Sequence, residues 1–274
     1  MSQVWLIGRP VAHSLSPAMH NAAFAKLGLP HRYEARETAD DQLAATLDRM
    51  RRDDVLGANV TIPYKEAVLR LLDEVDDEAR RIGAVNTIVR RGGRLFGHNT
   101  DKYGFEKALE TQPRRIPGGE GFPFADDTIC ILGAGGAARA CALSLLEHGN
   151  RVEIANRDPG RAESLAGSLE VDGRHPTVVP WPRGRVLPDA VVNATPLGLN
   201  GEDALEDAVL PMWVIDLVPT AVETPLVKRA KATENVTVVD GLSMLLHQAA
   251  RSFELWTGVP APLEVMRAAL PRDV

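Results

Sequence analysis

The stretch that decides the fold of this 274-residue chain is TICILGAGGAARACALSLL, residues 128–146. Its first five residues, four of them apolar, are typical of a buried strand, and residues 139–146 are typical of a buried helix. Between them, Gly133, Gly135 and Ala138 occupy the small positions of a dinucleotide-binding turn. Such a turn needs a tight bend, close approach of a pyrophosphate to the backbone and close helix–strand packing. A tight strand-to-helix turn without a ligand is the alternative.

Strand–helix alternation continues downstream of this stretch. Apolar runs predict further strands at residues 151–155, 177–179, 190–193, 214–217 and 236–239. Because helical segments lie between several of these strands, we expect a parallel sheet covered on both faces. Helices at 241–256 and 263–270 are expected to end the chain.

The first hundred residues predict a second α/β unit. Strands are expected at 4–7, 32–35 and 57–62, and helices at 17–27, 41–50 and from Pro63 to about 72. Proline suits a first helical turn because its missing N–H has no partner there. Gly92-Gly93, between strands at 84–90 and 94–97, indicates a hairpin. Residues 113–127, rich in Pro, Gly and charge, are predicted to connect the two units.

Length and composition restrict the class of protein. A chain of 274 residues fits two domains, and 45% hydrophobic with 25% charged residues is typical of a globular protein. A net charge of −6 disfavours a general nucleic-acid binder. The only two cysteines, Cys130 and Cys141, are too few for a disulfide framework, and we expect both to be buried. Because no leader-like or membrane-spanning run is found, we expect a cytoplasmic protein without a membrane partner.

The residues after the expected strand 151–155 indicate which dinucleotide is bound. An NAD-binding site normally carries an acid there, but this chain has Asn156-Arg157, with Arg161 four residues further on. A guanidinium makes paired, charge-assisted hydrogen bonds to a phosphate. We therefore expect NADP(H), the alternative being a solvated helix start at which Asp158 weakens the positive field.

Small polar residues precede the first expected helix. Ser14 and Ser16, in HSLSP, are either caps of that helix or ligands of a carboxylate. In NVTIPYK, Asn59 and Thr61 lie on one side of a strand, and Lys65 follows at an expected helix start, where a lysine is usually just solvated.

Two further polar residues, Asn86 and Asp101, lie near the expected hairpin. Capping a helix is the ordinary role of Asp101. Together, however, Lys65 and Asp101 could form a coupled pair that moves a proton to or from a hydroxyl group. These residues alone do not identify the substrate.

Eight motifs in order along nearly the whole chain give a closer indication. They are GRPVAHSLSPAMHN (8–21), GANVTIPYK (57–65), IGAVNT (82–87), GHNTD (97–101), GAGGAARA (133–140), NRDPGRA (156–162), NATPLGL (193–199) and GLSMLLHQA (241–249). In these motifs the sequence resembles the shikimate dehydrogenase family. The resemblance implies reversible reduction of 3-dehydroshikimate to shikimate with NADPH, in the route to chorismate and the aromatic amino acids.

The resemblance also implies roles for individual residues. Lys65 would be the acid/base, with Asp101 orienting the hydroxyl and tuning Lys65. Ser14 and Ser16 would bind the carboxylate, and the ring hydroxyls would contact Thr61, Asn86, Asp101 and Gln248. The expected cofactor-binding residues are Gly133, Ala134, Gly135, Gly136, Ala137, Asn156, Arg157, Arg161, Leu217 and Gly241. No metal is expected.

One position departs from the family pattern. Pro219 stands where the family usually has a tyrosine near the substrate, so a phenolic donor is missing. His247, beside Gln248, is expected at the helix surface or the edge of the cleft rather than as a catalyst.

The expected architecture is therefore two α/β domains with a cleft between them. Residues 1–104, completed by helices in 241–274, would bind the substrate, and residues 105–240 would form a Rossmann-like NADP domain. Such a chain would be a monomer or a homodimer. One alternative is a quinate/shikimate dehydrogenase that uses NAD, which the arginine at position 157 disfavours. The other is a non-catalytic NADP-binding relative. Such a relative could lose Lys65 or Asp101, but both are present.

Overall fold

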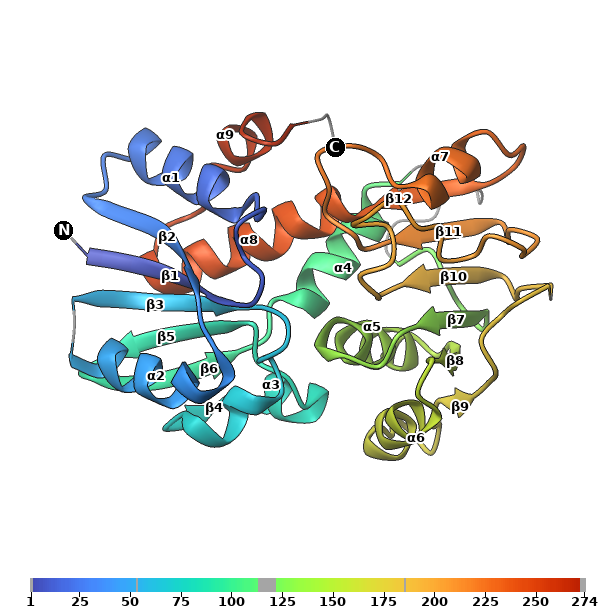
Figure 1. Ribbon diagram of the computed structural model, residues 1–274, viewed down its shortest axis with the longest axis horizontal. Coiled ribbons are helices and arrows are strands. Elements are labelled where there is room, and N and C mark those ends of the chain that lie inside the picture. The colour runs from blue at the N-terminus through green and yellow to red at the C-terminus, as the bar shows by residue number, and fades with distance from the viewer. Residues whose placement is uncertain (1, 53, 113–121, 185, 272–274) are drawn as a thin grey trace. The chain divides into compact units, whose positions relative to one another are not determined.

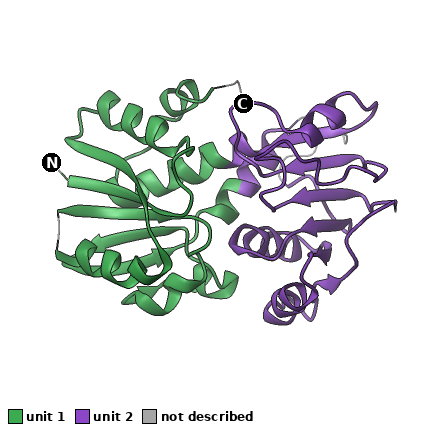
Figure 2. Cartoon of the chain, viewed as in Figure 1, with its two compact units in different colours: residues 1–104, 245–273 green, residues 105–244, 274 purple. Residues whose placement is uncertain are grey.

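The computed structural model describes residues 2–52, 54–112, 122–184 and 186–271 (Figure 1). The chain divides into two compact units, coloured separately in Figure 2. Unit 1 comprises Met1–Gly104 and Leu245–Asp273, and unit 2 comprises Phe105–Met244. Each unit contains one six-stranded sheet, which confirms the predicted α/β fold class.

The sheet of unit 1 is mixed and has the order β2-β1-β3-β5-β6-β4. Its strands are β1 (Ser2–Gly8), β2 (His31–Glu37), β3 (Val55–Val60), β4 (Glu74–Val75), β5 (Thr87–Arg91) and β6 (Arg94–His98). The first three strands run parallel, whereas β5 pairs antiparallel with both β3 and β6. Gly92 and Gly93, both at positive φ, connect β5 to β6 and confirm the predicted hairpin.

Helices surround the first sheet. They are α1 (Ser16–Lys26), α2 (Leu43–Arg52), α3 (Asp77–Ile82), α9 (Leu263–Ala268), and parts of α4 (Asp101–Glu110) and α8 (Gly241–Thr257). Single 3-10 turns occupy Asp40–Gln42 and Ala67–Leu71. The apolar core of the unit includes Trp5, Ile7, Leu47 and Ile88.

The helix predicted from Pro63 is wrong. The Ile62–Pro63 peptide is cis, and residues 61–65 form turns, with the Tyr64 N–H donating to the Thr61 carbonyl at 2.9 Å. Helical structure begins only with the short 3-10 segment at Ala67. Lys65 therefore lies in a turn and not at a helix start, so no helix dipole acts on its charge there.

The sheet of unit 2 is entirely parallel, with the order β12-β11-β10-β7-β8-β9. Its strands are β7 (Thr128–Leu132), β8 (Arg151–Ala155), β9 (Thr177–Val178), β10 (Ala190–Asn193), β11 (Trp213–Asp216) and β12 (Thr237–Asp240). The helices α5 (Gly136–Glu147), α6 (Pro159–Ser168) and α7 (Pro225–Lys231) connect some of them.

Apolar residues of β7 alternate between the two faces of this sheet. Ile129 and Ile131 pack into one core cluster, and Cys130 and Leu132 pack into another. The predicted parallel sheet with both faces covered is thus confirmed. Cys130 and Cys141 are both buried, as expected. Of the predicted connection 113–127, residues 113–121 lie outside the described part of the chain.

Candidate active site

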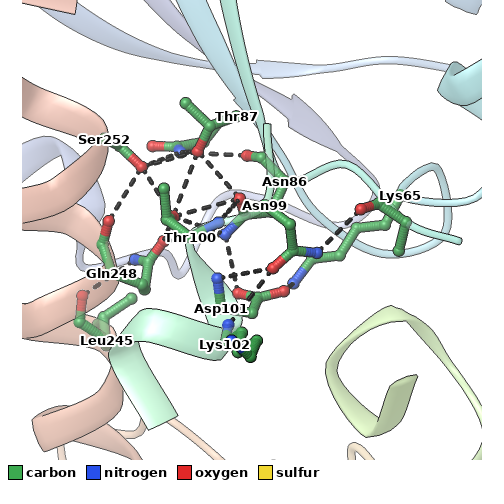
Figure 3. A network of polar contacts seen from close by, with 12 residues as sticks. Lys65, Asn86, Thr87, Asn99, Thr100, Asp101, Lys102, Leu245, Gln248 and Ser252 are labelled. Carbon is green, nitrogen blue, oxygen red and sulfur yellow. Dashed lines mark hydrogen bonds and ion pairs between the residues drawn. The ribbon is translucent and has the colours of Figure 1, made fainter. Parts of the chain in front are cut away.

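Lys65, Asp101 and Asn86 meet in unit 1, as Figure 3 shows. The Lys65 ammonium donates to Asp101 Oδ2 at 2.6 Å, and Asn86 Nδ2 donates to Asp101 Oδ1 at 2.8 Å. The carboxylate is 5% exposed and the lysine side chain 16%, so the ion pair is largely shielded but Lys65 reaches the surface. Both oxygens of Asp101 therefore have a donor, and its orientation is fixed from two sides.

Asp101 is available for this pairing because another residue caps helix α4. Asn99 Oδ1 accepts from the Asp101 N–H at 2.9 Å, and Asn99 Nδ2 donates to the Ala84 carbonyl at 2.9 Å. The alternative interpretation of Asp101 as the cap is therefore wrong. Asparagine is as good a cap as aspartate, so the motif GHNTD offered two candidates of equal quality.

A buried polar network extends from Asn86 to helix α8 (Figure 3). Asn86 Nδ2 also lies within hydrogen-bond distance of Thr100 Oγ1 at 2.9 Å and Gln248 Oε1 at 3.3 Å. The predicted residues Asn86, Asp101 and Gln248 are thus brought together, although 162 positions separate the first from the last. All of them are buried, so each hydrogen bond is made without competition from water.

Ser252, which lies one helical turn after Gln248, is a member of the network that was not predicted from the sequence. Its hydroxyl contacts Thr87 Oγ1 at 2.8 Å and Thr100 Oγ1 at 3.0 Å, and it donates to the Gln248 carbonyl at 3.0 Å. Ser252 is fully buried and links α8 to β5 and to the start of α4. The signal in the sequence was the i, i+4 spacing of two polar residues on an otherwise apolar helix face.

Asn59 supports this network from strand β3. Its Nδ2 lies 3.1 Å from the Asn86 carbonyl, and its Oδ1 accepts from the Tyr33 hydroxyl at 2.8 Å. Burial raises the pKa of Tyr33 above its ordinary value. The His20 ring stacks on Tyr33 with centroids 4.5 Å apart, and full burial lowers the pKa of His20 to about 3. Both rings are therefore neutral and act as packing elements.

Ser14 and Ser16 precede and begin helix α1. Ser14 Oγ accepts from the Ser16 N–H at 3.3 Å, but no side chain caps the helix, whose N-cap is Leu15. Ser16 is buried and its side chain is hydrogen-bonded to Tyr33, whereas Ser14 is half-buried. The structure thus favours neither serine as a regular cap.

Thr61 follows β3 and packs tightly against Gly8 at the end of β1. A Cβ added to Gly8 would lie 2.2 Å from Thr61 Cγ2 and 2.9 Å from the Ile62 carbonyl oxygen. Only glycine therefore allows the turn that carries Thr61 to lie against β1. This requirement was not recognised from the sequence.

The glycine turn of unit 2 has the features of a phosphate-binding turn. Gly133 has a φ of +109°, and a Cβ there would lie 3.1 Å from the Ala194 carbonyl oxygen. Gly135 is the N-cap of α5, and nothing lies within 4 Å of the position its Cβ would take. No side chain caps α5, so its first N–H groups and the positive end of its dipole are left for an anion at Gly136 and Ala137.

Arg157 follows β8, at the same edge of the sheet. It is exposed and lines a cavity of about 900 Å³ together with Asn156. Asn156 Nδ2 donates to the Asp158 carbonyl at 2.9 Å, and Asp158 Oδ1 accepts from the Gly160 N–H at 3.0 Å to cap α6. Asp158 is therefore engaged by its own helix, while Arg157 faces the cavity.

The other predicted cofactor residues lie at the ends of β11 and β12. Gly241 packs on the backbone of Leu217, since a Cβ there would lie 2.6 Å from the Leu217 carbonyl carbon. Asp216, at the end of β11, is a buried carboxylate that was not predicted from the sequence. It accepts hydrogen bonds from Asn193 Nδ2 at 2.8 Å and from the Thr224 hydroxyl at 2.5 Å. Burial raises the pKa of Asp216 to about 6.

Two expectations concerned single side chains near the expected cleft. His247 is 8% exposed, which disagrees with a place at the helix surface; the other expected place, at the edge of the cleft, stays a prediction. Pro219 is exposed, and the neighbouring Thr220 hydroxyl donates to the Val222 carbonyl at 2.6 Å.

Within the described residues, no three potential metal ligands come together, and no helix is long and apolar enough to cross a membrane.

Comparisons with known proteins match nearly the whole length of the chain. Models described as the shikimate dehydrogenase substrate-binding domain and the shikimate 5'-dehydrogenase C-terminal domain match residues 6–88 and 241–270, and one described as coenzyme F420-dependent NADP oxidoreductase matches residues 128–186. The chain is 44% identical to the shikimate dehydrogenase (NADP(+)) of Symbiobacterium thermophilum, over 96% of this chain and 92% of that protein. It is 39% identical to that of Methanocaldococcus jannaschii, over 97% and 95%.

Solved structures agree with these relatives. The shikimate 5-dehydrogenase of Thermus thermophilus, in complex with NADP(H) and shikimate, has a TM-score of 0.82 and 40% identity, with 98% of each chain covered. The quinate dehydrogenase of Corynebacterium glutamicum, in complex with NAD, has a TM-score of 0.79 and 33% identity, with 98% of each chain covered.

Proposed function

This chain belongs to the shikimate dehydrogenase family, and from that premise we propose that it reduces 3-dehydroshikimate reversibly to shikimate, with Lys65 and Asp101 at the centre of the chemistry. It is an NADP-dependent shikimate dehydrogenase, an oxidoreductase that acts on a CH–OH group. The observation that carries the assignment of the site is the Lys65–Asp101 pair held by Asn86.

The residues of unit 1 would move the proton. Lys65 Nζ donates to the developing alkoxide when the ketone is reduced, and accepts the hydroxyl proton in the reverse direction. Asp101 keeps the ammonium group aimed, because the carboxylate itself is fixed by Asn86 at 2.8 Å. NADPH, when bound, supplies the hydride, and the chain needs only to position and polarise the substrate.

We assign the remaining binding roles to the predicted residues. Ser14 and Ser16 bind the carboxylate, and Thr61, Asn86 and Gln248 bind the ring hydroxyls. We assign substrate binding to residues 1–104 with the C-terminal helices, and NADP binding to residues 105–240. Gly133, Gly135 and the start of α5 bind the pyrophosphate, and Arg157 binds the 2'-phosphate. A cytoplasmic monomer or homodimer is proposed, in keeping with a chain that has only two cysteines, both buried.

The test is NADPH formation from shikimate and NADP⁺, followed by absorbance. Lys65→Met keeps the apolar stem and removes the ammonium, and should reduce kcat about 10²–10⁴-fold, the usual contribution of a general acid/base. Lys107→Met, which removes an exposed lysine paired with Glu110 at 2.5 Å, is the matched control. Turnover by Lys65→Met within a few-fold of wild type would contradict the role. Quinate and NAD⁺ in parallel test the alternative activity.

A further inference from the structure

The cavity beside Arg157 is lined in part by a segment that the cofactor motifs do not include. It lies in unit 2, where the connections after three strands meet: residues 156–159 after β8, 178–183 after β9, and 203–207 after β10. The volume is about 900 Å³. Since the strands are parallel, all three connections start from the same edge of the sheet, where open α/β sheets bind their ligands.

Trp181 is the aromatic side chain of this segment. It is half-buried and packs against the core cluster that contains Cys130, Leu132 and Val191, while it also lines the cavity. Pro180 and Pro182 flank it and restrict its backbone. The Arg183 N–H donates to the Trp181 carbonyl at 2.8 Å, which fixes the turn. The indole is therefore held in place before any ligand binds.

The lining of the cavity combines apolar and charged side chains. Leu197 and Leu205, from the connection after β10, are apolar, and Arg157 and Arg183 contribute guanidinium groups. A ligand that matches these groups has a flat aromatic ring and an anionic group, as the adenosine 2'-phosphate half of NADP has. Resting on the proposed function, we propose that Trp181 stacks on the adenine ring of bound NADP while Arg157 binds its 2'-phosphate.

The carboxylates of the cavity fix the direction of this ligand. Asp203 is paired with Arg229 at 2.8 Å, so its charge is compensated. Glu206 and Asp207 are exposed and come from the connection after β10, whereas Arg157 follows β8; strand β7 lies between these two strands in the sheet. The phosphate is therefore repelled from the β10 side and attracted to the side of β8 and β9, where Arg157 and Arg183 are.

Binding of 2',5'-ADP, measured by calorimetry without shikimate, tests this assignment. Stacking of a base on an aromatic side chain predicts that Trp181→Ala weakens binding roughly five- to a hundredfold, whereas Trp181→Phe stays within about threefold. Trp213→Phe, in the same unit but outside the cavity, is the matched control and should bind as wild type does. Unchanged affinity of Trp181→Ala would overturn the proposal.

Fluorescence gives a second measurement that does not depend on the folding of the alanine variant. Adenine stacked on an indole quenches its emission, so 2',5'-ADP should quench wild type strongly and Trp181→Phe weakly. Equal quenching in both proteins, or no binding of 2',5'-ADP to wild type, would overturn the proposal. If Trp181 controls nucleotide binding but wild type does not oxidise shikimate, the proposed function fails and the inference about Trp181 stands.

Discussion

Replacing His20 should change how the stability of the protein depends on pH. The imidazole is fully buried among Tyr33, Phe253 and Trp256, and neither ring nitrogen has a hydrogen-bond partner within the described residues. Its pKa falls from 6.5 in the unfolded chain to about 3 in the folded one. Between these values the unfolded chain binds a proton that the folded chain does not, so folding is disfavoured as the pH falls.

The size of the effect follows from the difference in pKa. Each pH unit below 6.5 costs about 1.36 kcal/mol of unfolding free energy, down to about pH 3. At pH 5 the loss caused by His20 is therefore about 2 kcal/mol, and above pH 7.5 it is absent. His20→Phe keeps an aromatic ring and removes the titrating group, so this part of the acid sensitivity should disappear.

Urea unfolding at several pH values between 5 and 8 measures the effect. The free energy of unfolding of His20→Phe minus that of wild type should rise by about 2 kcal/mol from pH 8 to pH 5. His20→Leu, which packs differently, should show the same pH dependence from a different starting value. A difference that is constant across this range would refute the argument that His20 is buried in its neutral form.

Three further changes test other parts of the molecule. The free energy of unfolding of Asp216→Asn minus that of wild type should rise as the pH rises from 3.8 to about 6 and stay constant above it. The reason is that the folded chain holds the Asp216 proton to a higher pH than the unfolded chain does. Urea unfolding at pH 4 and 7 measures this difference. Arg157→Ala should weaken NADPH roughly ten- to a hundredfold and NADH far less, since a charge-assisted contact to the extra phosphate is lost; equal losses in titrations with both cofactors would make Arg157 structural. Ser14→Ala should raise the KM for shikimate and leave the melting temperature within about 1–2 °C, because Ser14 makes one long local hydrogen bond; a lower melting temperature with unchanged KM would identify it as a cap.

Much of unit 2 could be predicted because its signals are local. The strands at 128–132, 151–155 and 190–193 have the predicted bounds, since each is a short apolar run closed by turn residues. The turn after β3 could not be predicted. Pro63 has the same sequence signature at the first turn of a helix and in a tight turn, and the observed turn places Thr61 against Gly8, a contact that no local pattern reveals.

The residues of the candidate site could be predicted from the sequence, but the hydrogen bonds that hold them in place could not. Lys65 and Asp101 were expected as a pair from their residue types. Asn86 and Gln248 were added to this pair only through the family resemblance, because no local pattern connects residues so far apart in the chain. The residue types of Ser252 and Asn59 do not reveal which contacts they make. Their role depends on buried hydrogen bonds to Thr87 and Asn86, which exist only once three elements have packed.

The division of unit 1 into two segments affects the order in which the protein can mature during synthesis. Phe253 and Trp256 of α8 lie in its aromatic core, and Gln248 and Ser252 complete its polar network. The ribosome adds these residues after unit 2, so the first hundred residues emerge without part of their own interior. Unit 2 is continuous in sequence and can fold first. A nascent chain arrested near residue 244 should therefore bind the nucleotide but leave Lys65 and Asp101 in an incomplete, chaperone-dependent intermediate.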